Sequence, residues 1–303
     1  MSAPYESLEA TVATVTDLSP SIRRVTLRGP GLQRVHPRCL DRRIKLLLPR
    51  HDGDRLQDVP RGSDWYPRWQ ELAGRPAMRT YTARQVRPSS GEVDIDVIRH
   101  GTSGPAGRWI ETVQPGDALV LAAPIAGAEG GDDVGIAWRP GAARELLIAG
   151  DATAAPAIAN ILASLPDDAT GTALVELPTS DDHYPLAAPA GIELRILPCD
   201  GSVPGTRLEE ELAGLAWPPG CPQHTDEAHT DGATTDEAAE GGADPEAPLW
   251  QEAQPDVEAR HYAWLAGEST AITRIRRQLV QARGCPRQCV SFMGYWRLGR
   301  AEC

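Results

Sequence analysis

Two short segments, at 79–84 and 100–109, carry the residue types best suited to hold a large ligand. Arg79-Thr80-Tyr81-Thr82 places a guanidinium, an aromatic ring and two hydroxyls on a run typical of a strand. The second segment contains Gly104-Pro105-Ala106, a turn of small residues that opens a helix. An arginine can pair bidentately with a phosphate, a tyrosine can pack on a flat ring, and a threonine can hydrogen-bond the edge of that ring. Together the segments predict a site for a planar ring joined to phosphates.

The turn suits the phosphate end of such a ligand. Pro105 lies in the first helical turn, where its missing N–H costs nothing, and small neighbours let phosphate oxygens reach the free amides there. His100, just before the turn, and Trp109, on the helix, are further candidate cofactor contacts. Trp109 is expected on the buried face of the helix with Val113. A plain strand followed by a plain helix would contain the same residue types. Both segments in one β-rich region favour a flavin dinucleotide, FAD.

These segments lie in a part of the chain with the pattern of β-structure. Short runs, several of them alternating apolar and polar residues, are separated by Gly, Pro and Asp. The runs are Leu8–Thr16, Ile22–Leu27, Ile44–Leu48, Met78–Gln85, Val93–Ile98 and Ala118–Ala122. They predict a small antiparallel β-barrel domain over residues 1–125.

After a linker at 126–142, the pattern changes to alternating strands and helices. This alternation predicts an α/β domain with a parallel sheet over residues 143–303. Gly150-Asp151-Ala152-Thr153-Ala154 follows a buried-type strand and opens a helix, and Gly267-Glu268 repeats this turn at a later strand. Because open sheets of this class bind nucleotides at such turns, these residues are candidates to hold a nicotinamide cofactor, with Glu176 as a ribose contact.

Two adjacent aromatic residues, Tyr295 and Trp296, follow the last predicted strand. They can cover a flavin face or stack on adenine, and a tail packed on the sheet explains them equally well.

The acidic charge of the chain is concentrated in one segment. Residues 218–259 hold eleven Asp or Glu and no Lys or Arg, so they account for nearly all of the net charge of −12. This low-complexity composition cannot offset the entropy of ordering, which predicts a disordered insertion. The chain has no basic stripe and no long apolar run. It is therefore expected to bind no nucleic acid, to insert in no membrane and to be cytoplasmic. Its scattered cysteines predict reduced thiols and no metal site.

The motifs together resemble the siderophore-interacting protein family of FAD-dependent ferric-siderophore reductases, within the ferredoxin-reductase-like superfamily. The resemblance rests on Arg43-Ile44-Lys45-Leu46, Arg79-x-Tyr81-Thr82-x-Arg84, Asp94-x-Asp96, Gly104-Pro105-Ala106-x-x-Trp109, Gly150-Asp151-x-Thr153-Ala154, Ala266-Gly267-Glu268 and Gly294-Tyr295-Trp296-Arg297. It implies an FAD-binding barrel of the ferredoxin-reductase type followed by a nicotinamide-binding α/β domain. It adds Arg84 and Asp96 to the candidate cofactor contacts. It also implies a basic pocket for an anionic ferric siderophore, with Lys45, the only lysine of the chain, and Arg297 as candidates.

The function implied is NADPH- or NADH-driven reduction of a ferric siderophore, which releases Fe(II) for iron assimilation. The cofactor carries the electrons, so the reaction requires no catalytic side chain and no protein metal ligand. The alternatives are a flavoprotein reductase that serves a protein acceptor, such as a ferredoxin or an oxygenase, and a non-catalytic siderophore carrier. The sequence does not identify the siderophore, the oligomeric state, the role of the acidic insertion or a third basic residue of the pocket. It also does not choose among NADPH, NADH and reduced ferredoxin as the electron donor.

Overall fold

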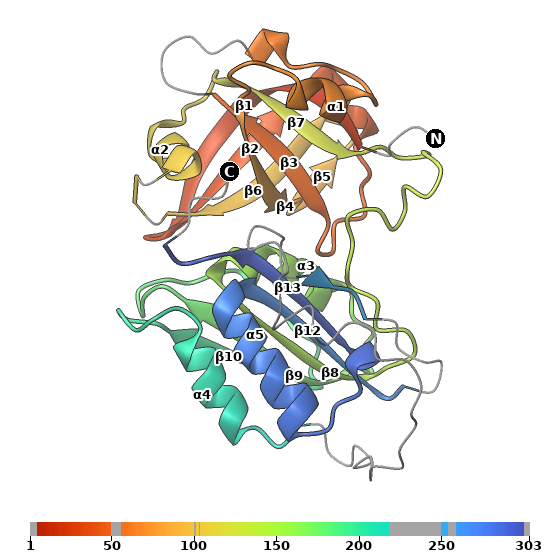
Figure 1. The fold of residues 1–303 in the computed structure, drawn as a ribbon, viewed down its shortest axis with the longest axis vertical. Helices are drawn as coiled ribbons and strands as arrows, with labels where there is room; N and C mark the ends of the chain where they lie inside the picture. The colour runs from red at the N-terminus through yellow and green to blue at the C-terminus, as the bar shows by residue number, and fades with distance from the viewer. Residues whose placement is uncertain are drawn as a thin grey trace.

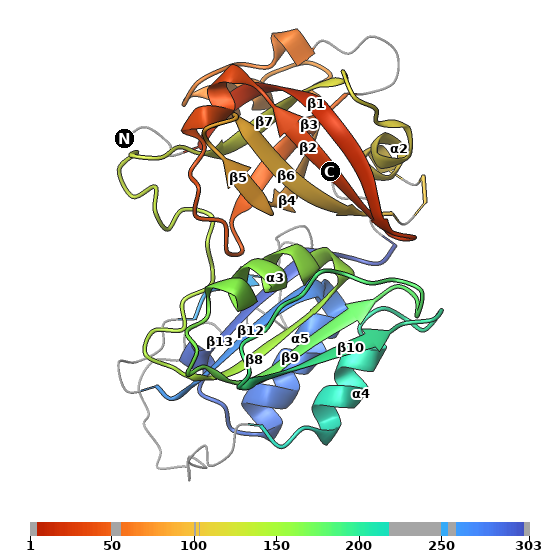
Figure 2. The same cartoon turned by 180° about the vertical axis from the view of Figure 1, so that it is seen from behind.

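The computed structural model describes residues 5–49, 56–99, 101–102, 104–217, 250–253 and 259–299. Two sheets dominate the molecule, and Figures 1 and 2 show them stacked one above the other, each with its own helices. The N-terminal half of the chain forms the upper sheet, and the C-terminal half forms the lower one. No helix in the described part of the chain is long and apolar enough to cross a membrane.

The first sheet is antiparallel and curled into a half-barrel. Its strands are β1 (Tyr5–Ser19), β2 (Ile22–Arg28), β3 (Arg43–Leu48), β4 (Ala77–Thr82), β5 (Gln85–Arg87), β6 (Glu92–Ile98) and β7 (Ala118–Pro124). They follow the order β4-β3-β7-β1-β2-β6-β5. The short helices α1 (Trp65–Gln70) and α2 (Gly104–Thr112) lie against it, with 3₁₀ turns η1 (Pro30–Arg34) and η2 (Leu56–Asp58). Apolar residues that alternate along the strands, such as Val25, Leu46 and Ile95, fill its interior, as the predicted barrel requires.

One predicted strand, Met78–Gln85, is two strands in the structure. It breaks at a corner, where the Ala83 amide donates to the Arg42 carbonyl at 2.9 Å and the Arg84 amide donates to the Asp94 carbonyl at 2.9 Å. The chain therefore passes from the β3 side of the sheet to the β6 side. This corner closes the curl and leaves β4 and β5 at the two ends of the strand order.

The second sheet is parallel except at one edge. It contains β8 (Glu145–Asp151), β9 (Thr170–Leu177), β10 (Ile192–Pro198), β11 (Trp250–Gln251), β12 (His261–Glu268) and β13 (Val290–Trp296), in the order β10-β9-β8-β12-β13-β11. Helix α3 (Ala155–Ser164), preceded by η3 (Ala152–Ala154), covers one face, while α4 (Thr206–Gly214) and α5 (Ser269–Arg277) cover the other (Figure 2). After α5 come a π-helical turn, η5 (Gln278–Ala282), and a 3₁₀ turn, η6 (Arg287–Cys289). The two-domain fold class predicted from the sequence is confirmed.

Part of the predicted insertion 218–259 is ordered, so that prediction was wrong at its C-terminal end. Trp250 and Gln251 pair antiparallel with Met293 and Phe292, and the buried Ala253 donates its amide to Ser291 Oγ at 2.8 Å. An edge strand needs only a neighbouring strand with free backbone groups, which composition does not reveal. The prediction for 218–249 and 254–258 falls on residues outside the described ranges.

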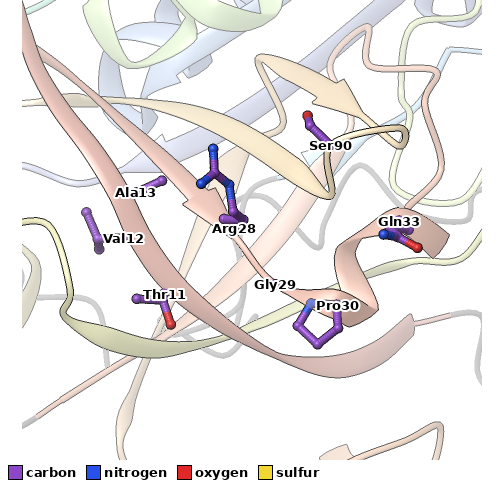
Figure 3. Close-up of a pocket in the computed structure, with 8 residues that line it drawn as sticks. All are labelled: Thr11, Val12, Ala13, Arg28, Gly29, Pro30, Gln33 and Ser90. Carbon is purple, nitrogen blue, oxygen red and sulfur yellow. The ribbon is translucent and has the colours of Figure 1, made fainter.

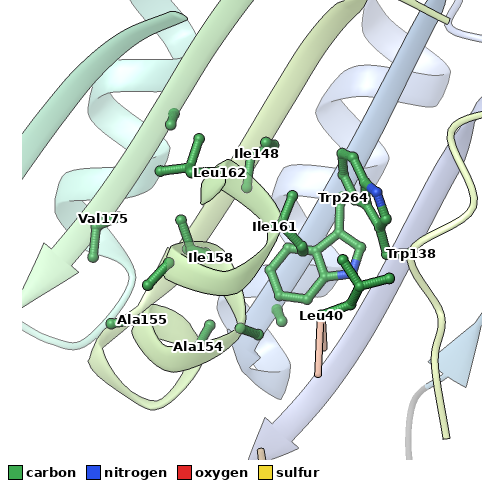
Figure 4. Close-up of a cluster of buried hydrophobic side chains, with 14 of the residues drawn as sticks. Leu40, Trp138, Ile148, Ala154, Ala155, Ile158, Ile161, Leu162, Val175 and Trp264 are labelled. Atoms are coloured by element: carbon green, nitrogen blue, oxygen red, sulfur yellow. The ribbon is translucent and has the colours of Figure 1, made fainter. Parts of the chain in front are cut away.

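Apolar side chains from both halves of the chain form one core between the sheets. Leu40, from the loop before β3, packs in the same cluster as Ile161 of α3, Trp264 of β12 and Trp138, which precedes β8 (Figure 4). The nearby Asp41 carboxylate accepts the Trp264 indole N–H at 3.1 Å and the Ala137 amide at 3.0 Å. Burial raises the pKa of Asp41 above its ordinary value, and these donors oppose that shift. The contacts hold the first sheet against the second.

Candidate functional site

Strand β4 carries the first candidate segment at an end of the curled sheet. Arg79 pairs with Leu46 and Tyr81 pairs with Ile44, so both side chains share the face of these core residues. The Arg79 side chain is buried, and the one hydrogen bond recorded for it in the described part of the chain joins Nη1 to the Met78 carbonyl at 2.8 Å. Among the described residues no carboxylate forms an ion pair with Arg79, and a buried cation without such a partner is costly, which makes Arg79 suited to an anionic ligand.

Helix α2 begins at Gly104 as the second segment predicts. Gly104 has a φ of +74°, which favours glycine, and Pro105 and Ala106 form the first turn. A side chain at Gly107 would collide with the Gly101 carbonyl, so the turn lies tight against the helix. Trp109 and Val113 are buried, as expected. His100 lies outside the described residues.

The two halves of the site meet where Thr82 of β4 faces Tyr295 of β13. Burial raises the pKa of Tyr295 well above its ordinary value, and the Thr82 hydroxyl opposes that shift. The Tyr295 hydroxyl is nevertheless buried without a completed hydrogen bond in the described part of the chain. The predicted flavin-edge contact and the predicted aromatic cover are therefore neighbours, although 213 positions separate them in the numbering.

Buried polar atoms that lack partners test whether these residues fit FAD. Across the described residues six buried side-chain atoms have no hydrogen bond, and three of them belong to predicted cofactor contacts: Arg84 Nε, which lies 3.9 Å from Asp96 Oδ2, Trp109 Nε1 and Tyr295 Oη. An unpaired buried donor costs about 1–3 kcal/mol, so such donors are rare unless a ligand uses them. With the buried Arg79 guanidinium, this set fits a large polar group such as FAD.

Two predicted cofactor contacts, Arg84 and Asp96, lie in a buried network between the halves of the chain. Asp96 accepts two hydrogen bonds from Arg24, at 2.7 and 2.8 Å, and one from the Tyr184 hydroxyl. Arg84 Nη1 donates to Asn160 Oδ1 at 2.9 Å. These side chains are committed to holding the two halves together, and a role toward the cofactor stays a prediction for both.

The carboxyl edge of the parallel sheet brings Gly150, Asp151 and Thr153 together with Trp296. Asp151 is buried and accepts four hydrogen bonds: from the Thr153 amide (2.9 Å) and hydroxyl (2.5 Å), from the Glu268 amide (2.8 Å) and from Trp296 Nε1 (2.7 Å). Burial raises its pKa, and these donors oppose the shift. Asp151 thus connects the ends of β8, β12 and β13. The indole N–H of Trp296, the only donor of that side chain, is used in this contact.

The glycines on this edge permit close approach of backbone and side chains. Gly267 has a φ of +152°, and a Cβ there would lie 2.7 Å from Asp151 Oδ2. A Cβ at Gly150 would lie 2.6 Å from the Ala154 methyl group, and Ala154 is itself fully buried. The neighbouring Glu268 accepts the Thr270 and Ala271 amides at 2.8 and 2.9 Å and so caps α5.

Gly267→Ala is expected to destabilise the fold by roughly 2–4 kcal/mol, because strain and a clash with Asp151 act together. Gly116→Ala is the matched control, since Gly116 has a φ of +99° with open space around it, and backbone strain alone costs about 1 kcal/mol. Urea unfolding of both variants measures the difference. Equal losses at the two positions would show that the Asp151 contact does not matter.

The two predicted substrate residues lie on different elements. Lys45 on β3 donates from Nζ to Thr80 Oγ1, and Arg297 is exposed just after β13. A further cation, Arg43, was not among the predicted substrate residues: it shares the Lys45 face of β3 and pairs in register with Thr82. Its guanidinium carbon lies 3.6 Å from the Trp250 ring centre, and its Nη2 lies 3.5 Å from the Glu252 carboxylate. The period of two along a strand was the signal that would have found it.

An open hollow of about 490 Å³ lies elsewhere, beside β1 and the turn after β2 (Figure 3). Its lining includes Thr11, Arg28, Gln33 and Ser90, and it shares no residue with the candidate site.

A curled antiparallel sheet joined to a mostly parallel α/β sheet is the two-domain fold of the ferredoxin-reductase-like proteins. In fold the chain is similar to the ferredoxin reductase in carbazole 1,9a-dioxygenase, with a TM-score of 0.57 and 16% identity over 98% of this chain and 69% of that chain. The chain belongs to the siderophore-interacting protein family. Residues 11–129 match the siderophore-interacting FAD-binding domain, and residues 143–299 match the siderophore-interacting protein domain.

Two relatives place the chain more narrowly. It is 32% identical over 206 residues to the ferric vibriobactin reductase ViuB of Vibrio cholerae, covering 67% of this chain and 70% of that protein. The crystal structure of the siderophore-interacting protein SipS from Aeromonas hydrophila is similar with a TM-score of 0.70 and 26% identity, over 99% of this chain and 94% of that chain. The family resemblance inferred from the motifs is confirmed.

Proposed function

We propose that this protein is an FAD-dependent reductase that takes electrons from a nicotinamide cofactor, reduces a ferric siderophore and so releases Fe(II). The observation that carries the proposal is the contact of Asn160 of α3 with the two residues that follow Thr82: its Nδ2 donates to the Ala83 carbonyl at 2.9 Å and its Oδ1 accepts from Arg84 at 2.9 Å. It sets the predicted flavin strand against the edge of the sheet where α/β folds bind nucleotides. The similarity to a protein named ferric vibriobactin reductase supports the substrate class.

Each predicted residue then has a binding or orienting task. Arg79 and the amides at the start of α2 would hold the FAD diphosphate. Tyr81 would pack on the flavin ring, and Thr82 would hydrogen-bond its edge. Lys45 and Arg297, with Arg43 as a third cation, would attract the anionic chelate. Bound FAD supplies the conversion of two-electron to one-electron transfer.

The first experiment is an absorbance spectrum of the purified protein, followed by anaerobic addition of NADH or NADPH and then of a ferric siderophore with a ferrous trap. Flavin bands that bleach with the nucleotide and return as the ferrous complex forms would support the proposal. Bound flavin that reduces a ferredoxin or an oxygenase but never the chelate would point to a protein acceptor. A protein without flavin would contradict the proposal.

Lys45→Gln is expected to raise the KM for the ferric siderophore about tenfold, the typical worth of one charge-assisted contact. The rate of flavin reduction by the nucleotide should not change, because this variant keeps the predicted FAD contacts. Arg144→Gln is the control: it removes a half-exposed cation that lies 3.7 Å from Asp168 in the other half of the chain. A KM that responds equally to both substitutions would mean that only overall charge matters.

A further inference from the structure

Three helices begin at the carboxyl edge of the parallel sheet, and an acidic side chain of the protein already accepts amides at each start. Free amides at such a helix start are the usual binding groups for a nucleotide phosphate. In this chain Glu176 acts at α4, Glu268 at α5, and Asp151 at the η3 turn that leads into α3. At the start of α4, where Glu176 accepts three amides, the occupied amides and the added negative charge disfavour a phosphate.

Of the three carboxylates, Glu176 is the one at the predicted ribose position. It lies near the end of β9, next to β8, where the ribose of a dinucleotide usually approaches the sheet. Its Oε1 accepts the Gly205 amide at 2.6 Å, and its Oε2 accepts the Arg207 and Leu208 amides at 3.1 and 3.3 Å. The expected ribose contact is therefore a helix cap. Burial raises the pKa of this carboxyl, and the three amides oppose that shift. The carboxyl group lies at the end of β9, where this fold would bring the 2′-phosphate of NADPH.

The loops around this position contain no compensating cation. Residues 178–191, after β9, and residues 199–205, after β10, hold no Lys or Arg, whereas they contain Asp181 and Asp200. Asp182, in the first of these loops, is buried and accepts hydrogen bonds from Ser19 and Ser21 in the first half of the chain. The Ser180 amide donates to Asp200 Oδ1 at 2.8 Å, which joins the two loops. The first arginine beyond them, Arg207, is paired with Glu210 at 3.0 Å. Proteins that accept a 2′-phosphate place an arginine near this point.

Resting on the proposed function, we propose that this edge selects a nicotinamide donor without a 2′-phosphate, which is NADH, and that Glu176 with the acidic loops after β9 and β10 determines the choice. The 2′-phosphate would add negative charge beside these carboxylates without gaining a cation or a free amide. Like charges brought together in this way reject the wrong partner more strongly than missing contacts do.

The test compares anaerobic flavin reduction by NADH and by NADPH in the FAD-loaded protein. We expect kcat/KM for NADH to exceed that for NADPH by at least about 30-fold. A second measurement needs no turnover: calorimetry should show that ADP binds at least about tenfold more tightly than 2′,5′-ADP. Equal or better use of NADPH, or tighter binding of 2′,5′-ADP, would overturn the inference.

Two variants and one control locate the effect. Ser180→Arg adds a cation at an exposed position in the loop after β9 and is expected to raise NADPH use about tenfold while NADH use is unchanged. Gln114→Arg makes the same charge change at an exposed position in the first half of the chain. It should change neither NADPH use nor NADH use. Glu176→Gln keeps an acceptor for the Gly205 amide but cannot carry a negative charge. It should also lower the ratio of kcat/KM for NADH to kcat/KM for NADPH. If neither Ser180→Arg nor Glu176→Gln changes the preference for NADH, these loops do not cause it.

The outcomes separate this inference from the proposed function. If neither nucleotide reduces the flavin but dithionite-reduced protein reduces a ferric siderophore, the donor inference fails and the reductase survives. If NADH is preferred but no chelate is reduced, the donor inference stands and the siderophore reductase proposal fails.

Discussion

Replacing Arg79 with alanine is expected to give a folded protein that has lost most of its FAD. Two charge-assisted bonds to a diphosphate would disappear, and bonds to charged groups are worth about 1.5–3 kcal/mol each, so FAD should bind at least roughly 100-fold more weakly. The ratio of flavin absorbance to protein and a titration of the apoprotein with FAD measure this loss. The FAD affinity of Arg79→Lys should lie between those of the wild type and Arg79→Ala, because lysine keeps the charge but not the bidentate guanidinium.

The stability of the apoprotein makes this prediction specific to ligand binding. The Arg79 guanidinium is buried, and in the described part of the chain its recorded hydrogen bond goes to the neighbouring Met78 carbonyl. Removing a buried, unpaired charge relieves a cost, so apo Arg79→Ala should melt no lower than the apo wild type. Arg75→Ala, which removes an arginine lying 4.9 Å from the Trp69 ring centre, is the control and should retain FAD. A fully loaded Arg79→Ala protein would rule out the assigned role.

Asn160→Ala is expected to slow electron transfer from the nicotinamide to the flavin about tenfold to 100-fold, because small misplacements of reactants carry costs of that size. Asn160 extends from α3 across to the first half of the chain. Its Nδ2 donates to the Leu40 and Ala83 carbonyls at 2.8 and 2.9 Å, and its Oδ1 accepts from Arg84 at 2.9 Å. Ala83 and Arg84 directly follow Thr82, so this one amide fixes the flavin strand relative to the second sheet.

Measurements of stability, FAD affinity and electron-transfer rate distinguish a positioning role for Asn160 from a merely structural one. The substitution should also lower stability by about 2–3 kcal/mol, since it leaves buried partners unpaired. The FAD dissociation constant should change little, while the charge-transfer absorbance between nucleotide and flavin should weaken. Ser164→Ala is the control on the same helix, because the Ser164 hydroxyl bonds within α3 to Ile161 at 2.7 Å. An unchanged transfer rate in a destabilised Asn160→Ala protein would leave only the structural role.

Local patterns in the sequence were sufficient for the architecture. Alternation with a period of two predicts strands such as β2 and β6, and the small-residue turn at Gly104 predicts the start of α2, because such features depend on neighbours only a few residues away. The same patterns carried the family resemblance and the fold class. They also placed Arg79 and Thr82 on one strand, which is the strand that lies at the end of the curled sheet.

Tertiary structure alone decided how the charged residues are used. Asp96, which stays a predicted cofactor contact, accepts hydrogen bonds from Arg24 and Tyr184, and these partners lie 72 and 88 positions away. Glu176 was predicted to meet a ribose, but it caps a helix that begins 30 residues later. A carboxylate looks the same in a sequence whether it faces a ligand, a guanidinium or three backbone amides. Only packing brings those partners within hydrogen-bonding distance, and a buried charge binds whichever partners are there because remaining unpaired costs more.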